Sequence, residues 1–214
     1  MTTLTGKQVD DAALAGWANL GGVLVTRFAT PDFATGLELV DAIGALADEA
    51  NHHPDVDLRY TRVDVALTSH DAGGLTARDV DLARKVTEAA AVRDLTPDDT
   101  GVSRVELALD SPDHARVLPF WQAFLGYQRA EGLDDELRDP AGAQPMVWFQ
   151  ASGSDEPRQR WHLDVWVPPS QVQPRIDAAL AAGGTVDDGA APAFWVLTDP
   201  EGNRSCLCTW QQRD

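Results

Sequence analysis

Apolar side chains in the first hundred residues follow two different periods. Over residues 33–50 they recur every three or four positions, which is the pattern of an amphipathic α-helix, and a second stretch of this kind covers residues 80–90. Between them, residues 56–60 and 63–67 alternate apolar with polar side chains, which predicts the two strands of a hairpin. The pattern also indicates an earlier helix near residues 7–17 and a strand pair around residues 17–28. These elements predict an α+β domain with helices on one face of an antiparallel sheet.

Two short motifs mark where the longer helices should begin. Thr30 offers an N-cap followed by Pro31 at the first helical position, and the helix is expected to end near Asn51. Thr76 and Asp79 have the spacing of a capping box, so the second helix should start directly after Thr76.

The second half of the chain contains a weak internal repeat. A strand at residues 105–110 precedes a helical stretch at 115–125 and then further strands, and the same order returns with a strand at 161–167 and a helix at 170–182. Such a repeat predicts two βαβββ units whose sheets pair into a curved cup. Glu106 and His162 take matching positions on the two first strands. Alternation along the second of these strands should turn His162 and Asp164 toward the interior of the cup.

A polar segment at residues 93–101, containing Pro97 and Gly101, separates the predicted α+β domain from the repeat in the second half and is the best candidate for a linker. We therefore expect domains at residues 1–96 and 102–214, joined by a linker at 97–101. A chain of 214 residues is long enough for two domains of about 100 residues each.

The negative net charge argues against two classes of partner, nucleic acids and anionic membranes. A net charge of −17 repels nucleic-acid phosphates and anionic lipid surfaces. The first residues lack the apolar core of a signal peptide, and no apolar run could span a bilayer, so we expect a cytoplasmic protein. The two cysteines, Cys206 and Cys208, are too close on one strand to form a disulfide with each other.

Three of the five histidines, His52, His53 and His70, fall within 19 positions. The predicted helix end and strand end can converge on one pocket, and histidines exchange protons near neutral pH, so the set indicates acid–base chemistry. A carboxylate such as Asp48 would orient one of the rings. Two structural alternatives stay open: adjacent histidines before Pro54 can simply terminate a helix, and Asp79 can serve only as the capping acid.

This constellation resembles the pterin-4a-carbinolamine dehydratases over roughly the first 95 residues, through the acid ahead of His-His-Pro, Tyr60, Thr-Ser-His and Arg-Asp. The resemblance implies dehydration of a 4a-hydroxytetrahydropterin to a quinonoid dihydropterin, with the three histidines around the pterin and no cofactor. The residues implied in substrate binding are Asp48, Pro54, Thr68, Ser69 and Asp79. One position departs from the family, since Val56 stands where members usually carry a tryptophan.

Residues 102–210 resemble the glyoxalase-like members of the vicinal-oxygen-chelate superfamily. The motifs that carry this likeness are Phe120-Trp121, Leu125-Gly126, Trp148-Phe149-Gln150, His162-Leu163-Asp164 and Asp199-Pro200-Glu201-Gly202-Asn203. Metal ligands of such relatives would correspond to Glu106, His162, Cys206 and a position near Trp148. A tryptophan cannot ligate, and a thiol beside a carboxylate mixes soft with hard ligands. We therefore expect no metal, and a small-molecule pocket containing Glu106, His162, Asp164 and Cys206.

The main hypothesis is thus a hydro-lyase acting on a small pterin, with no nucleic-acid or membrane partner. Two alternatives stay open: a binding or regulatory protein that uses the glyoxalase-like cup, and a metal-dependent glyoxalase or dioxygenase in the second half. The exposed edge of the hairpin makes a homo-oligomer a further expectation, because an unpaired strand edge offers free backbone groups.

Overall fold

The computed structural model describes residues 2–152, 160–198 and 204–213. The chain separates into two compact units. The first runs through Ser103 and also takes in Val167–Val172 and the residues from Thr209, and the second comprises Arg104–Trp166 and Gln173–Cys208. The domain limits expected from the sequence, 1–96 and 102–214, stay a prediction.

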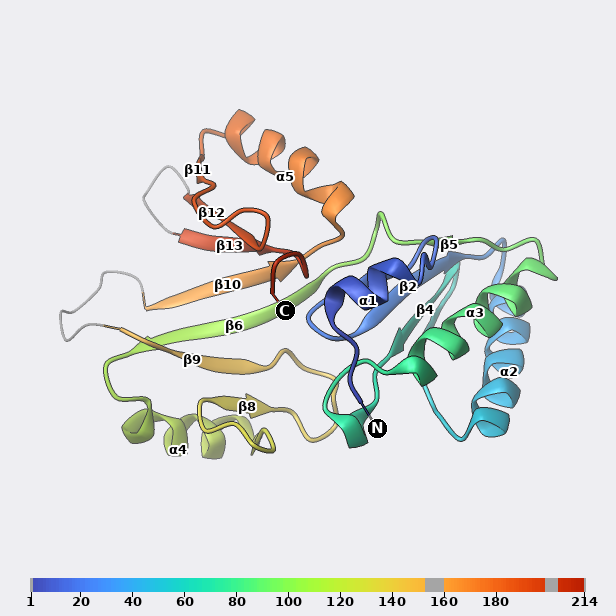
Figure 1. Cartoon of the computed structure of the whole chain (residues 1–214), viewed down its shortest axis with the longest axis horizontal. Coiled ribbons are helices and arrows are strands. Elements are labelled where there is room, and N and C mark those ends of the chain that lie inside the picture. Colours follow the sequence, from blue (N-terminus) through green and yellow to red (C-terminus); the bar gives the residue numbers. More distant parts are fainter. Residues whose placement is uncertain (1, 153–159, 199–203, 214) are drawn as a thin grey trace. The chain divides into compact units, whose positions relative to one another are not determined.

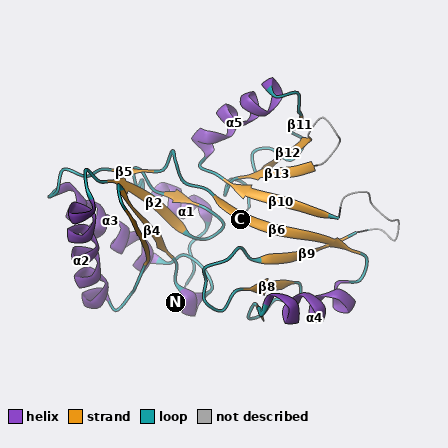
Figure 2. Ribbon diagram, turned by 180° about the vertical axis from the view of Figure 1, so that it is seen from behind, coloured by secondary structure: helices purple, strands orange, loops and turns teal. Residues whose placement is uncertain are grey.

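The first unit is a sheet covered by helices, as Figures 1 and 2 show for α2 and α3, which lie side by side. Its elements are α1 (Gly6–Asp11), β1 (Ala18–Asn19), β2 (Leu24–Ala29), α2 (Phe33–Ala50), β3 (Asp55–Arg59), β4 (Arg62–Leu67), the 3-10 helix η1 (His70–Ala72), α3 (Ala77–Ala91) and β5 (Pro97–Asp98). The strand order is β1-β2-β4-β3, with β5 paired to β2, and every pairing is antiparallel. The predicted α+β architecture is confirmed.

The two faces of this sheet differ in character. Phe28 lies opposite Val63, and both are fully buried beneath the helices. On the other face Arg27 lies opposite Asp64, and its guanidinium donates two hydrogen bonds of 2.6 and 2.7 Å to that carboxylate. The alternation read from the sequence therefore sets which side of each strand meets the helices.

Two helix limits differ from the sequence-based prediction. The first helix stops at Asp11 instead of continuing to residue 17, because Ala13 and Gly16 adopt positive φ angles that turn the chain out of the helix. The N-cap of α2 is Asp32 and not Thr30, since the Asp32 side chain accepts a hydrogen bond from the Thr35 N–H.

Two other limits are confirmed. Asn51 closes α2 in the left-handed conformation, and Thr76 with Asp79 forms the predicted capping box at the start of α3. The segment expected as a linker contributes β5, because Pro97–Asp98 pairs with β2 in the first sheet.

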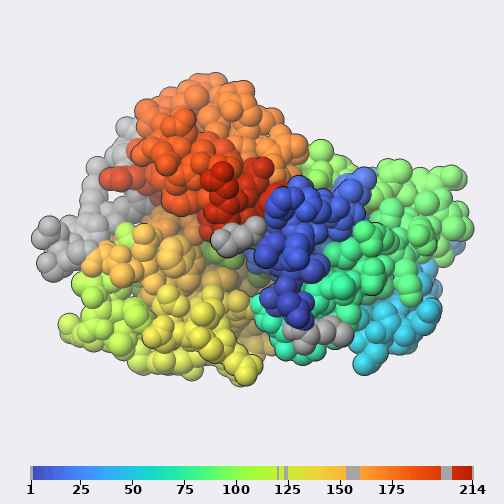
Figure 3. Space-filling model, in the orientation of Figure 1, coloured from blue at the N-terminus to red at the C-terminus, as the bar shows by residue number. Residues whose placement is uncertain are grey.

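Two hydrogen bonds hold the N-terminal segment against the rest of the first unit. The Leu4 N–H donates to the Leu75 carbonyl at 2.7 Å, and the Arg84 guanidinium donates to the Ala12 carbonyl at 3.1 Å. Figure 3 shows the blue N-terminal segment lying beside the teal and green residues of this region. None of the helices within the described residues is long and apolar enough to cross a membrane.

The second unit consists of two βαβββ repeats, as the sequence predicted. Its elements are β6 (Arg104–Ser111), α4 (His114–Leu125), β7 (Gln128–Arg129), β8 (Glu136–Arg138), β9 (Val147–Ala151), β10 (Trp161–Trp166), α5 (Pro169–Ala181), β11 (Thr185–Asp187), β12 (Phe194–Thr198) and β13 (Arg204–Cys208). The order β11-β12-β13-β10-β6-β9-β8-β7 places the two first strands, β6 and β10, side by side and antiparallel. Each first strand pairs in parallel with the last strand of its own repeat.

One face of this eight-stranded sheet packs against α4 through an apolar cluster of Leu109, Leu118, Leu137, Val147 and Phe149. Residues directly opposite each other share a face, so the strand register identifies the residues of the other face. We call this other side the polar face; it carries Glu106, Asp110, Glu136, Trp148, His162, Asp164, Trp166 and Cys206. The orientation predicted for His162 and Asp164 agrees with this register.

Gly16 allows a test of how β5 closes the first sheet. A Cβ at Gly16 would lie 2.3 Å from the Pro97 carbonyl oxygen, and its φ is +73°, whereas Gly22 has φ +79° and no neighbouring atom within 4 Å. We expect Gly22→Ala to lower the free energy of unfolding by about 1 to 2 kcal/mol, the cost of a left-handed non-glycine residue. Gly16→Ala should lower it by clearly more, because it adds a backbone clash. Urea unfolding of both variants measures the difference, and equal losses would contradict it.

Candidate functional site

His52 is held where the end of α2 turns toward β3. Its backbone N–H donates to the Ala47 carbonyl at 3.1 Å and so continues the helix cap formed by Asn51. Its side chain is 8% exposed, and its Nε2 lies 2.7 Å from Oδ1 of Asp79. The chain thus places one of the three predicted histidines in the interior of the first unit.

Asp79 is fully buried at the start of α3 and is surrounded by hydrogen-bond donors. Its Oδ2 accepts from the Ser69 hydroxyl at 2.7 Å and from the Thr76 backbone N–H at 2.7 Å. Its Oδ1 is the atom that meets His52. One carboxylate therefore caps a helix, holds the Ser69 side chain and orients a histidine.

This network selects one form of the His52 ring. An ionised carboxylate only accepts hydrogen bonds, so the Nε2 atom facing Asp79 carries a proton. In the tautomer that donates from Nε2 to Asp79, the lone pair lies on Nδ1, where the ring can accept a proton. A carboxylate–histidine pair of this kind fixes both the tautomer and the orientation of a base.

The other two histidines are exposed. His53 lies 3.1 Å from Asp48, and both side chains are largely in solvent, at 61% and 83% exposed. His70 opens η1 after β4, and in the described part of the chain its ring has no hydrogen-bond partner. The structure thus brings His52, Ser69 and Asp79 into one network and pairs His53 with Asp48, while His70 takes part in neither.

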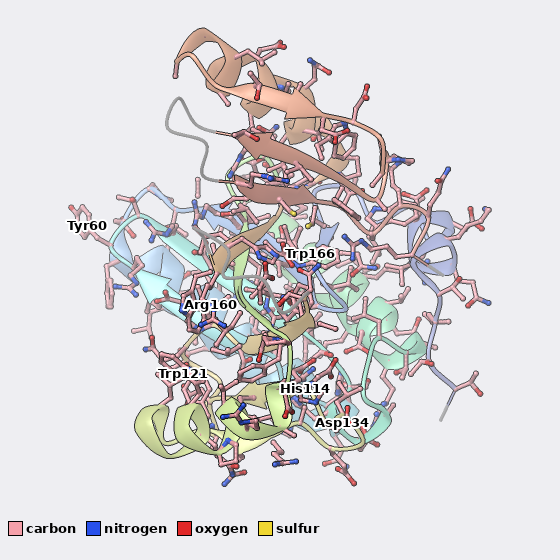
Figure 4. The ribbon with its side chains drawn as sticks, turned by 90° about the vertical axis from the view of Figure 1, so that its left-hand side faces the viewer. Tyr60, His114, Trp121, Asp134, Arg160 and Trp166 are labelled. Atoms are coloured by element: carbon pink, nitrogen blue, oxygen red, sulfur yellow. The ribbon has the colours of Figure 1, made fainter. Side chains whose placement is uncertain are left out.

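The remaining predicted residues of the first unit have structural contacts. Thr68 donates a hydrogen bond to the Gly22 carbonyl at 3.1 Å, and Pro54 is half-buried between His53 and β3. Val56 packs against the apolar core on the helix side of β3. Tyr60 lies at the turn of the hairpin with 73% of its surface exposed, and Figure 4 shows it pointing away from the molecule.

Reasoning from the sequence missed the partner of His52. It assigned the orienting carboxylate to Asp48 and favoured Asp79 as a capping acid. Asp79 does cap α3, but a carboxylate has two oxygens and the cap occupies one of them. The free oxygen of a buried capping acid was the signal that could have indicated a second partner.

On the polar face of the second unit, His162 stands between two carboxylates. Its Nδ1 is 3.6 Å from Asp110 and its Nε2 is 3.7 Å from Asp164. The Trp148 ring meets the imidazole edge-on, with 5.8 Å between ring centroids. Among the described residues, Asp110 Oδ1 and the Trp148 indole nitrogen are buried without a hydrogen-bond partner.

Glu106 lies across from Asp164 and is 9% exposed. Burial raises the pKa of its carboxyl group and outweighs the lowering effects of the Trp166 indole and Arg104, and the charges of Asp164 and Glu136 add smaller effects in the same direction as burial. A group with this shift is neutral over a wider pH range than an exposed glutamate. Trp166 itself is seen on the sheet in Figure 4.

The metal positions implied by the glyoxalase-like resemblance do not fit a site here. Trp148 occupies one of them and cannot ligate, and Glu106 is outside the group of donor atoms that converge. The donors that lie within 4.8 Å of one another belong to His162, Asp164 and Cys206. Of the motifs behind this resemblance, the Phe120 side chain and residues 199–203 lie outside the described residues.

With this geometry established, comparisons with known proteins identify both halves. Residues 2–89 match the family described as pterin 4 alpha carbinolamine dehydratase. A Thermomicrobium roseum protein, provisionally named as such a dehydratase, is 42% identical to this chain over 91 residues. The match covers 98% of that protein and 39% of this chain. This chain belongs to the pterin-4a-carbinolamine dehydratase family. A provisionally named dehydratase of Mycobacterium tuberculosis strain H37Rv is 41% identical over 88 residues, covering 94% of that protein and 40% of this one.

The dehydratase family accounts for the first half only. Residues 106–208 match a glyoxalase-like domain, so the chain joins a dehydratase domain to a glyoxalase-like one. A Brucella melitensis transcriptional coactivator/pterin dehydratase has a solved structure that is 30% identical, with a TM-score of 0.40, covering 41% of this chain and 98% of that one. A glyoxalase/bleomycin resistance protein/dioxygenase superfamily member from Vibrio splendidus is 16% identical with a TM-score of 0.34, covering 50% of this chain and 98% of that one.

The buried hydrogen bonds around Asp79 should contribute more to the free energy of unfolding of the dehydratase domain than an ordinary helix cap does. Asp32 is the matched control, because it also accepts a backbone N–H at a helix start but is exposed. Asp32→Ala should cost about 1 kcal/mol, whereas Asp79→Ala also leaves Nε2 of the buried His52 without its partner and should cost about 1 to 3 kcal/mol more. Urea unfolding measures both; similar losses would show that the buried network adds nothing.

The raised pKa of Glu106 predicts a pH-dependent stability of the glyoxalase-like domain. Above the ordinary value of 4.5 the unfolded chain has lost this proton while the folded protein keeps it, so the free energy of unfolding falls as the pH rises toward the folded pKa. Glu106→Gln should remove this part of the decline, and the exposed Glu131→Gln should keep it. The melting temperature of the wild type and the two variants is measured between pH 4 and 8. The same dependence of melting temperature on pH in all three proteins would contradict the prediction.

Proposed function

We propose that the dehydratase domain catalyses the loss of water from a 4a-hydroxytetrahydropterin. The observation that carries the proposal is the buried contact of 2.7 Å between His52 Nε2 and the Asp79 carboxylate, inside a domain of this family. The provisional names of the two relatives described above support the same reaction.

The reaction needs two proton transfers and no change of oxidation state. The C4a–O bond breaks, and the departing hydroxyl takes up a proton to leave as water. The N5–H proton is lost, and its electron pair forms the C4a=N5 double bond of the quinonoid dihydropterin. One general base and one general acid therefore suffice, and no redox cofactor is required.

The environments of the three histidines suit different roles in this scheme. His52 has its Nε2–H engaged by Asp79, so its Nδ1 is suited to accept the N5 proton. His53 and His70 are exposed, so either can exchange protons with water and supply the acid for the leaving hydroxyl. In this proposal Asp79 and Ser69 position His52, and Asp48 orients His53.

Pro54 and Thr68 shape the site through the backbone in this proposal. Pro54 sets the path of the chain from the two histidines into β3, and Thr68 ties the end of β4 to Gly22 just before Ser69 and His70. Val56 stands where this family usually has a tryptophan, and it packs against the core. In this proposal the substrate is therefore contacted by residues other than Val56.

An assay with enzymatically generated 4a-carbinolamine tests the proposal on the full chain. The wild-type protein should accelerate its decay over buffer, and His52→Ala should lower the rate by about 100-fold or more, the usual contribution of a positioned acid or base. Of His53→Ala and His70→Ala, the variant that removes the acid should lower the rate by a similar factor. His114→Ala, which changes a histidine in α4 of the other domain, should keep the wild-type rate.

Asp79→Asn separates positioning from folding. Its amide oxygen can accept from Thr76 and the side chain fills the same volume, but its NH2 group then faces His52 Nε2 as a donor and selects the opposite tautomer. We expect a lower kcat with a nearly unchanged KM, measured on protein whose circular dichroism matches the wild type. Decay of the carbinolamine at the buffer rate with wild-type protein would refute the proposed function.

A further inference from the structure

A cavity of about 420 Å³ lies in the first unit, and none of the three histidines of the dehydratase site lines it. Every residue that lines it belongs to this unit, which includes the chain from Thr209 onward. Cavities of about 300 to 1,000 Å³ are typical of small-molecule sites. We propose that this cavity binds a small organic cation, an ammonium group on an apolar or aromatic body, through Asp99, Trp17 and Trp210.

Trp17 forms a wall of the cavity that is fixed before any ligand binds. Its side chain is buried, and its indole N–H donates to the Thr87 hydroxyl at 3.0 Å. The Gly16 carbonyl beside it accepts a hydrogen bond of 2.6 Å from the Thr26 hydroxyl. Because the single polar atom of the Trp17 side chain is already bonded, the ring offers the cavity only its apolar and π surface.

Asp99 reaches the same cavity because β5 packs closely against the chain at Gly16. Pro97–Asp98 pairs with β2, and a Cβ on Gly16 would lie 2.3 Å from the Pro97 carbonyl oxygen. Burial raises the pKa of the Asp99 carboxyl group, and the charge of Asp98 adds a smaller effect in the same direction. This shift is the one expected of a carboxylate that lacks a cationic partner.

The charge of the lining favours a positive ligand. Asp10 is a second carboxylate at the cavity, and the described residues that line it include no lysine, arginine or histidine. Neither Asp10 nor Asp99 forms an ion pair within the described part of the chain. An ammonium group would supply a partner for Asp99, and the faces of indole rings attract cations as well.

The rest of the lining explains why the cation should be organic. Val9, Leu14 and Leu24 line the cavity together with the half-buried Trp210. Covering apolar surface of this kind is favourable only for a ligand that has an apolar surface of its own. A hydrated inorganic cation gains nothing from these side chains, whereas an aromatic or alkyl ammonium ion gains from both parts of the lining.

Calorimetric titration of the full chain with three probes of similar shape tests the proposal. 2-Phenylethylammonium carries a positive charge, 2-phenylethanol is neutral and 3-phenylpropionate is negative. We expect the ammonium ion to bind at one site per chain, and the alcohol to bind at least about 10-fold more weakly because it lacks the charge-assisted hydrogen bond. The propionate should bind more weakly still. Equal affinities for the ammonium ion and the alcohol, or no saturable binding of the ammonium ion at millimolar concentrations, would overturn the proposal.

Variants of two lining residues test whether binding occurs in this cavity. Asp99→Asn keeps the volume of the side chain but removes its charge, and should weaken ammonium binding by about 10-fold or more. Trp210→Leu keeps an apolar wall without the ring, and should weaken it by about 3- to 30-fold through loss of the cation–π contact. Circular dichroism and the melting temperature identify any variant that fails to fold.

Two control variants separate the cavity from other acidic sites. Asp98→Asn removes the neighbouring exposed carboxylate, which does not line the cavity, and should change the affinity by less than about twofold. Asp164→Asn removes a carboxylate from the polar face of the glyoxalase-like domain and should leave the affinity unchanged. Wild-type affinity in both Asp99→Asn and Trp210→Leu, or a loss in Asp164→Asn as large as in Asp99→Asn, would place the binding elsewhere and overturn the proposal.

Discussion

The Asp79 carboxylate is the interaction on which the dehydratase domain depends. It joins three parts of the chain: the first turn of α3, Ser69 beyond the end of the hairpin ten residues earlier, and His52 beyond the end of α2. A fully buried carboxylate is tolerated only when its oxygens are matched by donors, because each buried oxygen left without a donor keeps its cost of desolvation. The fold therefore has to bring all three donors into place together.

The same constraint prepares the proposed chemistry before any substrate binds. Asp79 and its hydrogen-bond partners already hold the His52 ring in place through Nε2, so no rearrangement of the ring is needed for Nδ1 to act in the proposed reaction. Preorganised groups of this kind lower the cost of reaching a reactive geometry. His53 and His70 differ in that they are open to solvent, which suits groups that must recover protons from water between turnovers.

The elements of the dehydratase domain were readable from the sequence because their signals are local. The spacing of apolar residues predicted α2 and α3, and the capping-box spacing of Thr76 and Asp79 predicted the start of α3. Thr30 and Asp32 are both good N-caps, and only the observed side-chain bond to Thr35 distinguishes them. The pair of His52 and Asp79 spans 27 residues, so no local pattern contains it. Alternation likewise predicted the face on which Asp164 lies, but its position beside Cys206 depends on the register between β10 and β13.

The two domains treat a buried carboxylate in opposite ways. Asp79 is surrounded by a hydroxyl, a backbone N–H and an imidazole nitrogen, so each of its two oxygens has a hydrogen-bond partner. Glu106 is buried on the sheet opposite Asp164, and burial is the largest cause of the raised pKa of its carboxyl group. The Trp166 indole and Arg104 offset part of this shift, and the charges of Asp164 and Glu136 add smaller contributions in the direction of burial. The glyoxalase-like domain thus meets the cost of a buried carboxyl group by favouring its protonated form, whereas the dehydratase domain surrounds the buried carboxylate of Asp79 with hydrogen-bond partners.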